Sequence, residues 1–316
     1  MALTDTVHAA PPRNPGPSWG CLFLTCADVL LPAPVFDFFL GLGTWVAVAV
    51  MPAARRHSRA YLAEVLPRRP GATDVWRHFF AFAQALMVKL RFAEGRPYRC
   101  VSGPDCAPFL DLMASGEPAL FGTFHFGHSD LLGFALGRFN RRVCMIRLRM
   151  ENSRDTDRLA ERFGALVSYL WINEPENLLF ALKEAIDSGV SVAMKCDRPE
   201  YSAKLEPFDF LGRPRLFPFT IYHLALVFRR PVIFCVSVPH GRDESMVYSS
   251  PVFTPNAGSR DENLDRARVH FQNFLALVET LLRRDPFLWA NFTPLNPVAA
   301  APEENGRSLR LSTPHA

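Results

Sequence analysis

The sequence offers little material for disulfide bonds. Its seven cysteines are scattered along 316 residues, are odd in number and include no Cys-x-x-Cys pair. Small secreted domains that depend on disulfides carry even numbers of cysteines at regular spacings. The pattern therefore argues against a disulfide framework and predicts a reduced compartment. The cysteines are Cys21, Cys26, Cys100, Cys106, Cys144, Cys196 and Cys235.

A secretory signal and a long hydrophobic run are also missing. Residues 1–20 are polar and rich in proline, without a basic start followed by an apolar stretch. No cleavable signal is expected, and the catalytic side should face the cytosol. Residues 21–51 are apolar but interrupted by Asp and Pro, and the longest clean run, Phe38–Met51, has 14 residues. Since a span takes roughly 20 residues, we expect an interfacial or buried helical hairpin.

Clusters of like-charged residues are absent from the sequence outside a single stretch. The net charge is +4, acidic and basic residues are interspersed, and no nucleic-acid motif is found, which argues against a nucleic-acid partner. One basic cluster directly follows the apolar segment. It would gain about 1 kcal/mol per residue beside anionic headgroups, although a solvated basic face explains it equally well. The basic cluster consists of Arg55, Arg56, His57, Arg59, Arg68 and Arg69.

The chain contains enough apolar material for one large core. With 316 residues and 49% hydrophobic content, a single compact domain is expected. We assign it to residues 21–293, with residues 21–60 as a membrane-associating helical segment. Residues 1–20 are expected to be disordered, and residues 294–316 to form a flexible tail.

Strand-like and helix-like segments alternate, which predicts an α/β fold with a mainly parallel central sheet flanked by helices. A long helix over 262–284 should turn Leu264, Val269, Phe271, Leu275, Val278 and Leu282 inward. The stretch before Pro214 is expected to be an irregular loop. The expected strands are 119–124, 142–148, 166–172, 190–196, 232–238 and 246–253; the other helices are 129–138, 156–163, 177–188 and 219–228.

The most informative motif follows the first of these strands. His125 falls in the turn between the apolar strand and an apolar helix, and Asp130 follows five positions later, in the first helical turn. From there a carboxylate can reach back to one imidazole nitrogen and fix the tautomer. The other nitrogen can then take a proton from a substrate hydroxyl. The spacing predicts a general base, His125, oriented by Asp130.

Three other interpretations fit the same residues. His128 can join His125 and Asp130 as a metal ligand set, although no fourth ligand is evident. The segment also approaches the serine-hydrolase pattern Gly-x-Ser-x-Gly, but Leu131 stands where the sharp turn needs a glycine. Finally, His125 can be a structural histidine that caps a helix beneath the core.

The His-x-x-x-x-Asp motif after a hydrophobic strand resembles the first signature block of the lysophospholipid acyltransferase superfamily. The closest branch is the bacterial lipid A biosynthesis (lauroyl/myristoyl) acyltransferases, and the likeness covers most of residues 22–295. Further stretches resemble that branch in the same order. They are Leu40–Gly43 with Arg55-Arg56 and Tyr61-Leu62, the strand Ser191–Asp197, Phe208–Gly212 with Phe217-Pro218 and Leu224-Ala225, and Phe287–Trp289.

The resemblance implies an O-acyltransferase on the cytoplasmic side of the inner membrane, peripheral or monotopic. It would move an acyl chain from acyl carrier protein or coenzyme A to a hydroxyl of a lipid or glycolipid, without a metal or other cofactor. The lipid A branch normally has Glu in place of Asp130 and often has Gly in place of Thr220 and Arg in place of Ala165. These departures leave the acceptor open among lipid A precursors, lysophospholipids, glycolipids and the polyene or aminolipid products of pigment-type pathways.

Guanidinium groups are the natural partners for phosphate on either substrate, because they bind its oxygens bidentately. Asp197 ends a strand and can hold an arginine, orient a sugar hydroxyl or cap a helix. A hydrolase that uses the same pair of residues, or a lipid-binding protein without activity, are the competing function classes. The candidate substrate-binding residues are Arg147, Arg149, Asp197, Arg198, Arg213 and Arg215.

Overall fold

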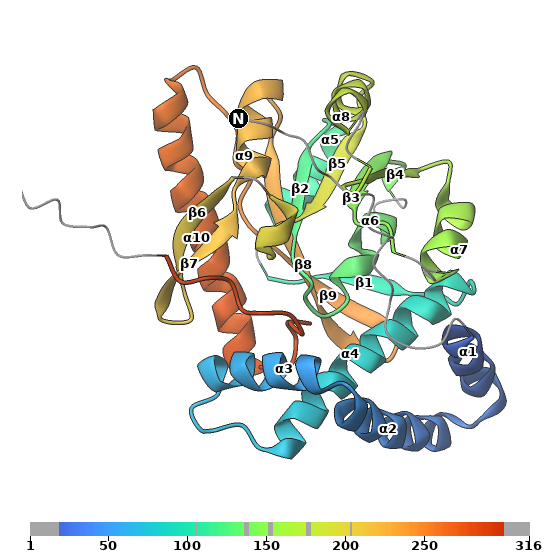
Figure 1. Cartoon of the computed structure of the whole chain (residues 1–316). Helices are drawn as coiled ribbons and strands as arrows, with labels where there is room; N and C mark the ends of the chain where they lie inside the picture. Colours follow the sequence, from blue (N-terminus) through green and yellow to red (C-terminus); the bar gives the residue numbers. More distant parts are fainter. Residues whose placement is uncertain are drawn as a thin grey trace, which may run out of the picture.

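A seven-stranded sheet forms the centre of the molecule (Figure 1). The computed structural model describes residues 19–104, 106–135, 139–150, 154–174, 178–202 and 204–299. The strand order is β1-β9-β8-β2-β5-β3-β4, with every neighbouring pair parallel except the antiparallel pair β8 and β9. The strands are β1 (Arg99–Ser102), β2 (Leu120–Thr123), β3 (Val143–Arg147), β4 (Val167–Trp171), β5 (Ser191–Lys195), β8 (Val232–Gly241) and β9 (Glu244–Ser249).

The sheet is covered by helices on both faces, which confirms the predicted α/β class. On one face, Leu120, Val192 and Phe234 pack into a core shared with α8 (Leu178–Asp187), α9 (Thr220–Phe228) and α10 (Arg260–Arg284). The alternate residues of the same strands point to the other face, because side chains in a strand alternate. There they meet α5 (Ala107–Ser115), η1 (Ser129–Leu131), α6 (Leu132–Ala135) and α7 (Arg154–Phe163).

Four helices precede the sheet: α1 (Gly20–Leu30), α2 (Ala33–Val50), α3 (Pro52–Val65) and α4 (Ala72–Ala93). Helices α1 and α2 pack against α4 through Phe36, Met87 and Leu90, and an ion pair of 2.6 Å joins buried Asp28 of α1 to Arg91 of α4. Ala33–Val50 is long and apolar enough to cross a membrane by length and composition, with a mean hydropathy of 1.7 and 17% of it buried. That length and composition alone do not establish a span.

The predicted loop before Pro214 is wrong, because residues 205–218 form an antiparallel hairpin of β6 (Leu205–Phe210) and β7 (Arg213–Pro218). Its two-residue turn is Leu211-Gly212, with φ of 53° and 71°. Leu is an unusual residue for the left-handed region, so the turn carries no sequence signal. Phe208 and Phe210 alternate into the core and supply the period of two that marks a strand.

Other predictions differ in detail. The edge strand β1 was not predicted, since it has only four residues and half-exposed side chains. In α10 the inward face is as predicted except for Val269, which is 62% exposed. The predicted flexible tail begins too early, because Val298 pairs with Arg215 and the amide of Ala299 donates to Pro214 of β7. Residues 1–18 and 300–316 lie outside the described residues.

Candidate active site

The register of two central strands brings the candidate catalytic residues together. Strands β2 and β5 are parallel neighbours, and Thr123 is paired with Lys195. Continuing each chain by two residues in the same direction places His125 beside Asp197. Both residues therefore lie at the carboxyl end of the sheet, where open α/β sheets bind their ligands. The turn after β2 needs a glycine, since Gly127 has φ of 48° and a β-carbon would collide with the carbonyl oxygen of Ser237.

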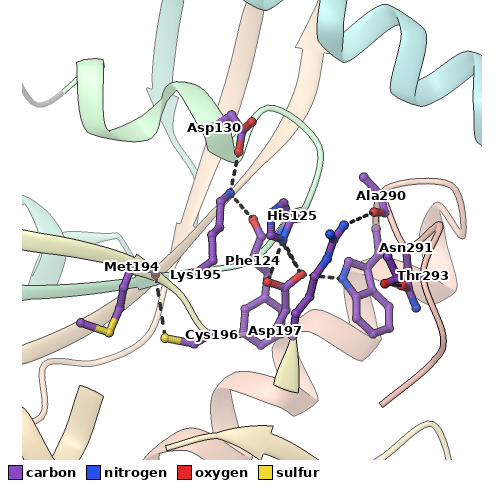
Figure 2. Close-up of polar contacts among 12 residues, drawn as sticks. Phe124, His125, Asp130, Met194, Lys195, Cys196, Asp197, Ala290, Asn291 and Thr293 are labelled. Atoms are coloured by element: carbon purple, nitrogen blue, oxygen red, sulfur yellow. Dashed lines mark hydrogen bonds and ion pairs between the residues drawn. The ribbon is translucent and has the colours of Figure 1, made fainter. Parts of the chain in front are cut away.

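Asp197 and His125 form a tightly bonded pair (Figure 2). Nδ1 of His125 lies 2.9 Å from Oδ1 and 3.1 Å from Oδ2 of Asp197, and the backbone amide of His125 donates to Oδ2 at 2.9 Å. A carboxylate only accepts hydrogen bonds, so Nδ1 must carry the ring proton. In the neutral ring Nε2 is then the nitrogen that can accept a proton, which is the state a general base requires.

This geometry corrects the role we predicted for Asp130. The carboxylate bonded to Nδ1 of His125 belongs to Asp197, and Asp130 makes an ion pair of 2.8 Å with Lys195. Two further cations, Lys89 and Arg147, lie 3.8 Å from Asp130. The physical reason is its position in η1, which directs the carboxylate over the end of β5. Lys195 also donates to the carbonyl oxygen of Phe124 at 2.8 Å and so ties Asp130 to the turn that carries His125 (Figure 2).

The charges around the pair set its ionisation. Burial alone raises the pKa of Asp197, but the His125 charge and hydrogen bond, with Arg198 and Lys195, hold that pKa well below its ordinary value. Burial lowers the pKa of His125, and Asp197 opposes this shift. For Asp130, burial again acts upward, but Lys195, Lys89 and Arg147 keep its pKa well below the ordinary range. At neutral pH both carboxylates are therefore charged and His125 is a neutral base.

An apolar cavity lies between the sheet and the helices α5 and α6, and its wall includes Asp130 and Lys195 but not His125 or Asp197. Two rows of side chains line the sheet side. The row at the strand ends is polar and the row beneath it is apolar. The polar row is Thr123, Lys195 and Arg147; the apolar row is Phe121, Ala193 and Met145.

Two buried polar atoms of the cavity wall make no hydrogen bond to the described residues. Oγ1 of Thr123 and Nη1 of Arg147 are buried, and neither has a hydrogen-bond partner among the described residues. Leaving a buried polar atom unpaired costs about 1–3 kcal/mol. Both atoms belong to residues of the polar row, so they mark the place where a ligand's oxygen atoms would satisfy them.

The predicted substrate-binding residues divide into two groups. Arg147 lines the cavity and Asp197 bonds His125, whereas Arg198 donates to the carbonyl oxygen of Ala290 at 3.0 Å, with its charge near His125. The structure does not bring Arg149, Arg213 or Arg215 to the cavity wall. These three make other contacts: Arg149 pairs with Glu174 and lies over Trp171, Arg213 is 60% exposed and faces Glu64, and buried Arg215 pairs with Glu64 and donates to Asn296.

The alternative readings of the motif gain little support. Within the described ranges, no group of three or more His, Cys, Asp and Glu side chains is arranged to hold a metal ion. His128 is buried behind the turn, where its backbone amide donates to Ser237, and burial lowers its pKa to about 4. Ser129 accepts a hydrogen bond from the amide of Ser237, so its hydroxyl holds the loop to β8.

Sequence reasoning missed several residues of the site. Lys195 is the last residue of β5 and stands two positions before Asp197, and this period of two was the available signal. Trp289 donates its indole N–H to Oδ2 of Asp197 at 2.9 Å. Lys89 reaches Asp130 from α4, and no sequence pattern linked that helix to the turn after β2.

Comparison of the chain with models of protein families and with curated proteins finds no match in either set. The site itself combines a buried carboxylate bonded to a neutral histidine, a second carboxylate with three cations around it, and an apolar cavity that two of those cations line. Such a site can bind an apolar chain with a polar head and abstract a proton from a hydroxyl beside that head.

Proposed function

We propose that the protein is an acyltransferase that moves a fatty acyl chain from an acyl thioester to a hydroxyl of a lipid or glycolipid. The observation that carries this proposal is that the His125–Asp197 pair follows the same two strand ends, at Thr123 and Lys195, that supply the polar row of an apolar cavity. We assign the apolar row of the cavity to the acyl chain, and Lys195 of its polar row bonds to the turn that carries His125. The donor would be acyl carrier protein or coenzyme A thioester, as the resemblance in the sequence implies.

The reaction needs one proton acceptor and one donor, and His125 can serve as both. Its Nε2 takes the proton of the acceptor hydroxyl as the oxygen attacks the thioester carbonyl carbon, and a C–O bond forms. The tetrahedral intermediate then collapses, the C–S bond breaks, and the imidazolium returns its proton to the thiolate. Asp197 stabilises the imidazolium and holds its ring in the required orientation.

The developing oxyanion needs donors, and the polar row of the cavity supplies candidates. Nη1 of Arg147 and Oγ1 of Thr123 are buried, lie on the cavity wall and have no partner in the described part of the chain. The charge of Lys195 adds to the field at the same place. One well-placed donor contributes about 3 kcal/mol to transition-state stabilisation. Asp130 would hold these cations in position rather than contact His125 at Nδ1.

The acceptor would approach from a membrane surface at the cytoplasmic side of the inner membrane. Helices α1 and α2 expose large apolar side chains, and α3, directly after them, carries arginines of the basic cluster. An apolar face next to basic residues favours attachment at the bilayer interface. The exposed aromatic side chains are Trp19, Phe23, Phe38, Phe39 and Trp45.

The decisive experiment measures release of free thiol from acyl carrier protein and coenzyme A thioesters, with and without lipid acceptors. We expect release that depends on the acceptor and a product that carries a new ester. His125→Ala should remove the activity, and His270→Ala, at a histidine that contributes no atom to the site, serves as the matched control. Equal thiol release without any acceptor would instead establish a hydrolase. Binding of fatty acyl chains without any thiol release would leave only a lipid-binding protein.

A further inference from the structure

A chain of buried hydrogen bonds runs from the N-terminal helices to Asp197. It begins in α3 with the hydroxyl of Ser58, which lies 2.8 Å from Nδ1 of His78 in α4. Nε2 of His78 lies 2.8 Å from the carbonyl oxygen of Trp289. The indole N–H of Trp289 then donates to Asp197. All four of these side chains are at most 1% exposed.

The direction of each hydrogen bond follows from the chemistry of the groups. A carbonyl oxygen only accepts, so Nε2 of His78 carries the proton and donates to Trp289. Burial lowers the pKa of His78 to about 4, which keeps the ring neutral at physiological pH. Nδ1 is therefore an acceptor, and the Ser58 hydroxyl donates to it. Each group in the chain is satisfied in one arrangement only, which makes the arrangement rigid.

Trp289 is also fixed by packing and by the backbone. Its ring meets Tyr61 of α3 and Phe210 of β6 edge to face, with centroids 5.4 and 5.5 Å apart. The backbone next to Trp289 is also hydrogen-bonded to the turn that carries His125, since the amide of Ala290 donates to the carbonyl oxygen of His125 at 2.8 Å. The segment of Trp289 thus lies between the catalytic turn on one side and α3 and α4 on the other.

We propose that Trp289 is a positioning residue for His125, held by Ser58 and His78, so that helices α3 and α4 support the orientation of the catalytic base. The inference rests on the proposed function for its effect on turnover, but the geometry of His125 can be tested without any reaction. The indole N–H competes with the ring of His125 for the charge of Asp197. It also keeps the carboxylate in the plane that Nδ1 requires.

The test replaces Trp289 with Phe, which keeps a ring and removes the N–H donor. Without this donor more of the negative charge of Asp197 faces His125, so the imidazolium is stabilised and the pKa of His125 rises. The other charges near the ring, Asp130, Lys195 and Arg198, are unchanged. We expect the nuclear magnetic resonance titration of His125 and the acidic limb of kcat/KM to shift upward by about half a pH unit, a modest part of the one-to-three-unit range of such effects. We also expect kcat to fall about tenfold or more with little change in KM.

A second pair of variants tests the supporting residue. His78→Leu should produce the same upward shift of the His125 titration, whereas His78→Gln, which retains an N–H donor for Trp289, should restore most of the activity. His270→Leu is the matched control. His270 is also a neutral histidine between a hydroxyl and a carbonyl, with Nδ1 2.6 Å from the Tyr222 hydroxyl and Nε2 2.8 Å from the carbonyl oxygen of Pro251.

The outcomes separate the two proposals. An unchanged titration of His125 in folded Trp289→Phe protein would overturn the positioning role, whatever its activity. A shifted titration in a protein whose parent transfers no acyl group would retain the positioning role and reject the proposed function. If Phe leaves a cavity that unfolds the chain, 3-benzothienylalanine at the same position keeps the two-ring shape without the N–H and answers the same question. If His270→Leu shifts the titration of His125 as much as His78→Leu does, the shift reflects a general loss of stability and the supporting role of His78 is rejected.

Discussion

Replacement of Asp197 by Asn is the sharpest test of the site. The carboxylate accepts from Nδ1 and the backbone amide of His125 and from the indole of Trp289. Asn keeps the size of the side chain but offers one oxygen, and its NH₂ group would face a donor. The substitution therefore removes the charge that stabilises the imidazolium and the bond that fixes the tautomer. We expect kcat to fall by about two to four orders of magnitude, the usual contribution of a positioned base.

The size of this effect can be compared with the structure. Two to four orders of magnitude correspond to about 2.7–5.5 kcal/mol of transition-state free energy. Hydrogen bonds to a charged group contribute about 1.5–3 kcal/mol each, and the bond to Nδ1 strengthens when the ring becomes charged. One such bond and the loss of the paired charge account for the expected range. Loss of the Asp197 charge should also lower the pKa of His125 further, so the acidic limb should move to lower pH.

Asp130→Asn provides the comparison, because the two carboxylates make different contacts. Both variants should lose activity, since Asp130 of the cavity wall pairs with Lys195 and lies near two more cations. Only Asp197→Asn should change the tautomer of His125, which nitrogen-15 resonance measures directly at neutral pH. A mixed tautomer in Asp130→Asn and a pure Nδ1–H tautomer in Asp197→Asn would refute the assignment made from the geometry.

Four further predictions follow from features of the core, the cavity and the surface. Below pH 6.5 the unfolded chain protonates His78 while the folded chain, with its pKa of about 4, does not; the free energy of unfolding should fall by up to about 3 kcal/mol as the pH drops to 4. Chemical denaturation against pH, with His78→Leu as the flatter comparison, measures this slope. Gly133→Ala should push the end of Met145 into the cavity and shift the preference in kcat/KM toward shorter acyl chains, by roughly tenfold for the longest substrate. Chelators should leave acyl transfer unchanged; loss that zinc restores would revive the metal interpretation. Glutamine at the exposed residues Arg56, Arg59 and Arg69 should weaken sedimentation of the protein with anionic vesicles and make that sedimentation less sensitive to salt. Unchanged sedimentation would assign the attachment to α1 and α2. Arg68 is left unchanged because it forms an ion pair of 2.6 Å with buried Asp74.

The sequence was informative wherever one local pattern decides the structure. The apolar run before Gly122 predicted strand β2, and the turn placed His125 at its end, because both depend on neighbours in the chain. The basic cluster after the apolar segment and the long helix α10 could be recognised in the sequence for the same reason. In α10, Ser259 and Glu262 form a capping box that fixes the start two residues before the predicted one.

The partner of His125 could not be read in this way. Asp130 is five positions away in sequence, but the bond at Nδ1 depends on which strand lies beside β2 and in which register. Strand order is a property of the whole sheet, and the crossover from β2 to β5 spans 72 residues between His125 and Asp197. The contribution of Trp289 is still less local, since it depends on a segment that follows the last helix.

The same long separations determine when the chain can acquire activity. During synthesis His125 emerges well before Asp197, which lies 72 residues later, and Trp289 follows after 92 more. At about 5–20 residues per second the nascent histidine waits several seconds for its first partner. Contacts so distant in sequence also form late in folding, because loop closure precedes them. Unfinished chains therefore carry the histidine without the bonds that orient it, and the proposed base is held in position only after the C-terminal segment has docked.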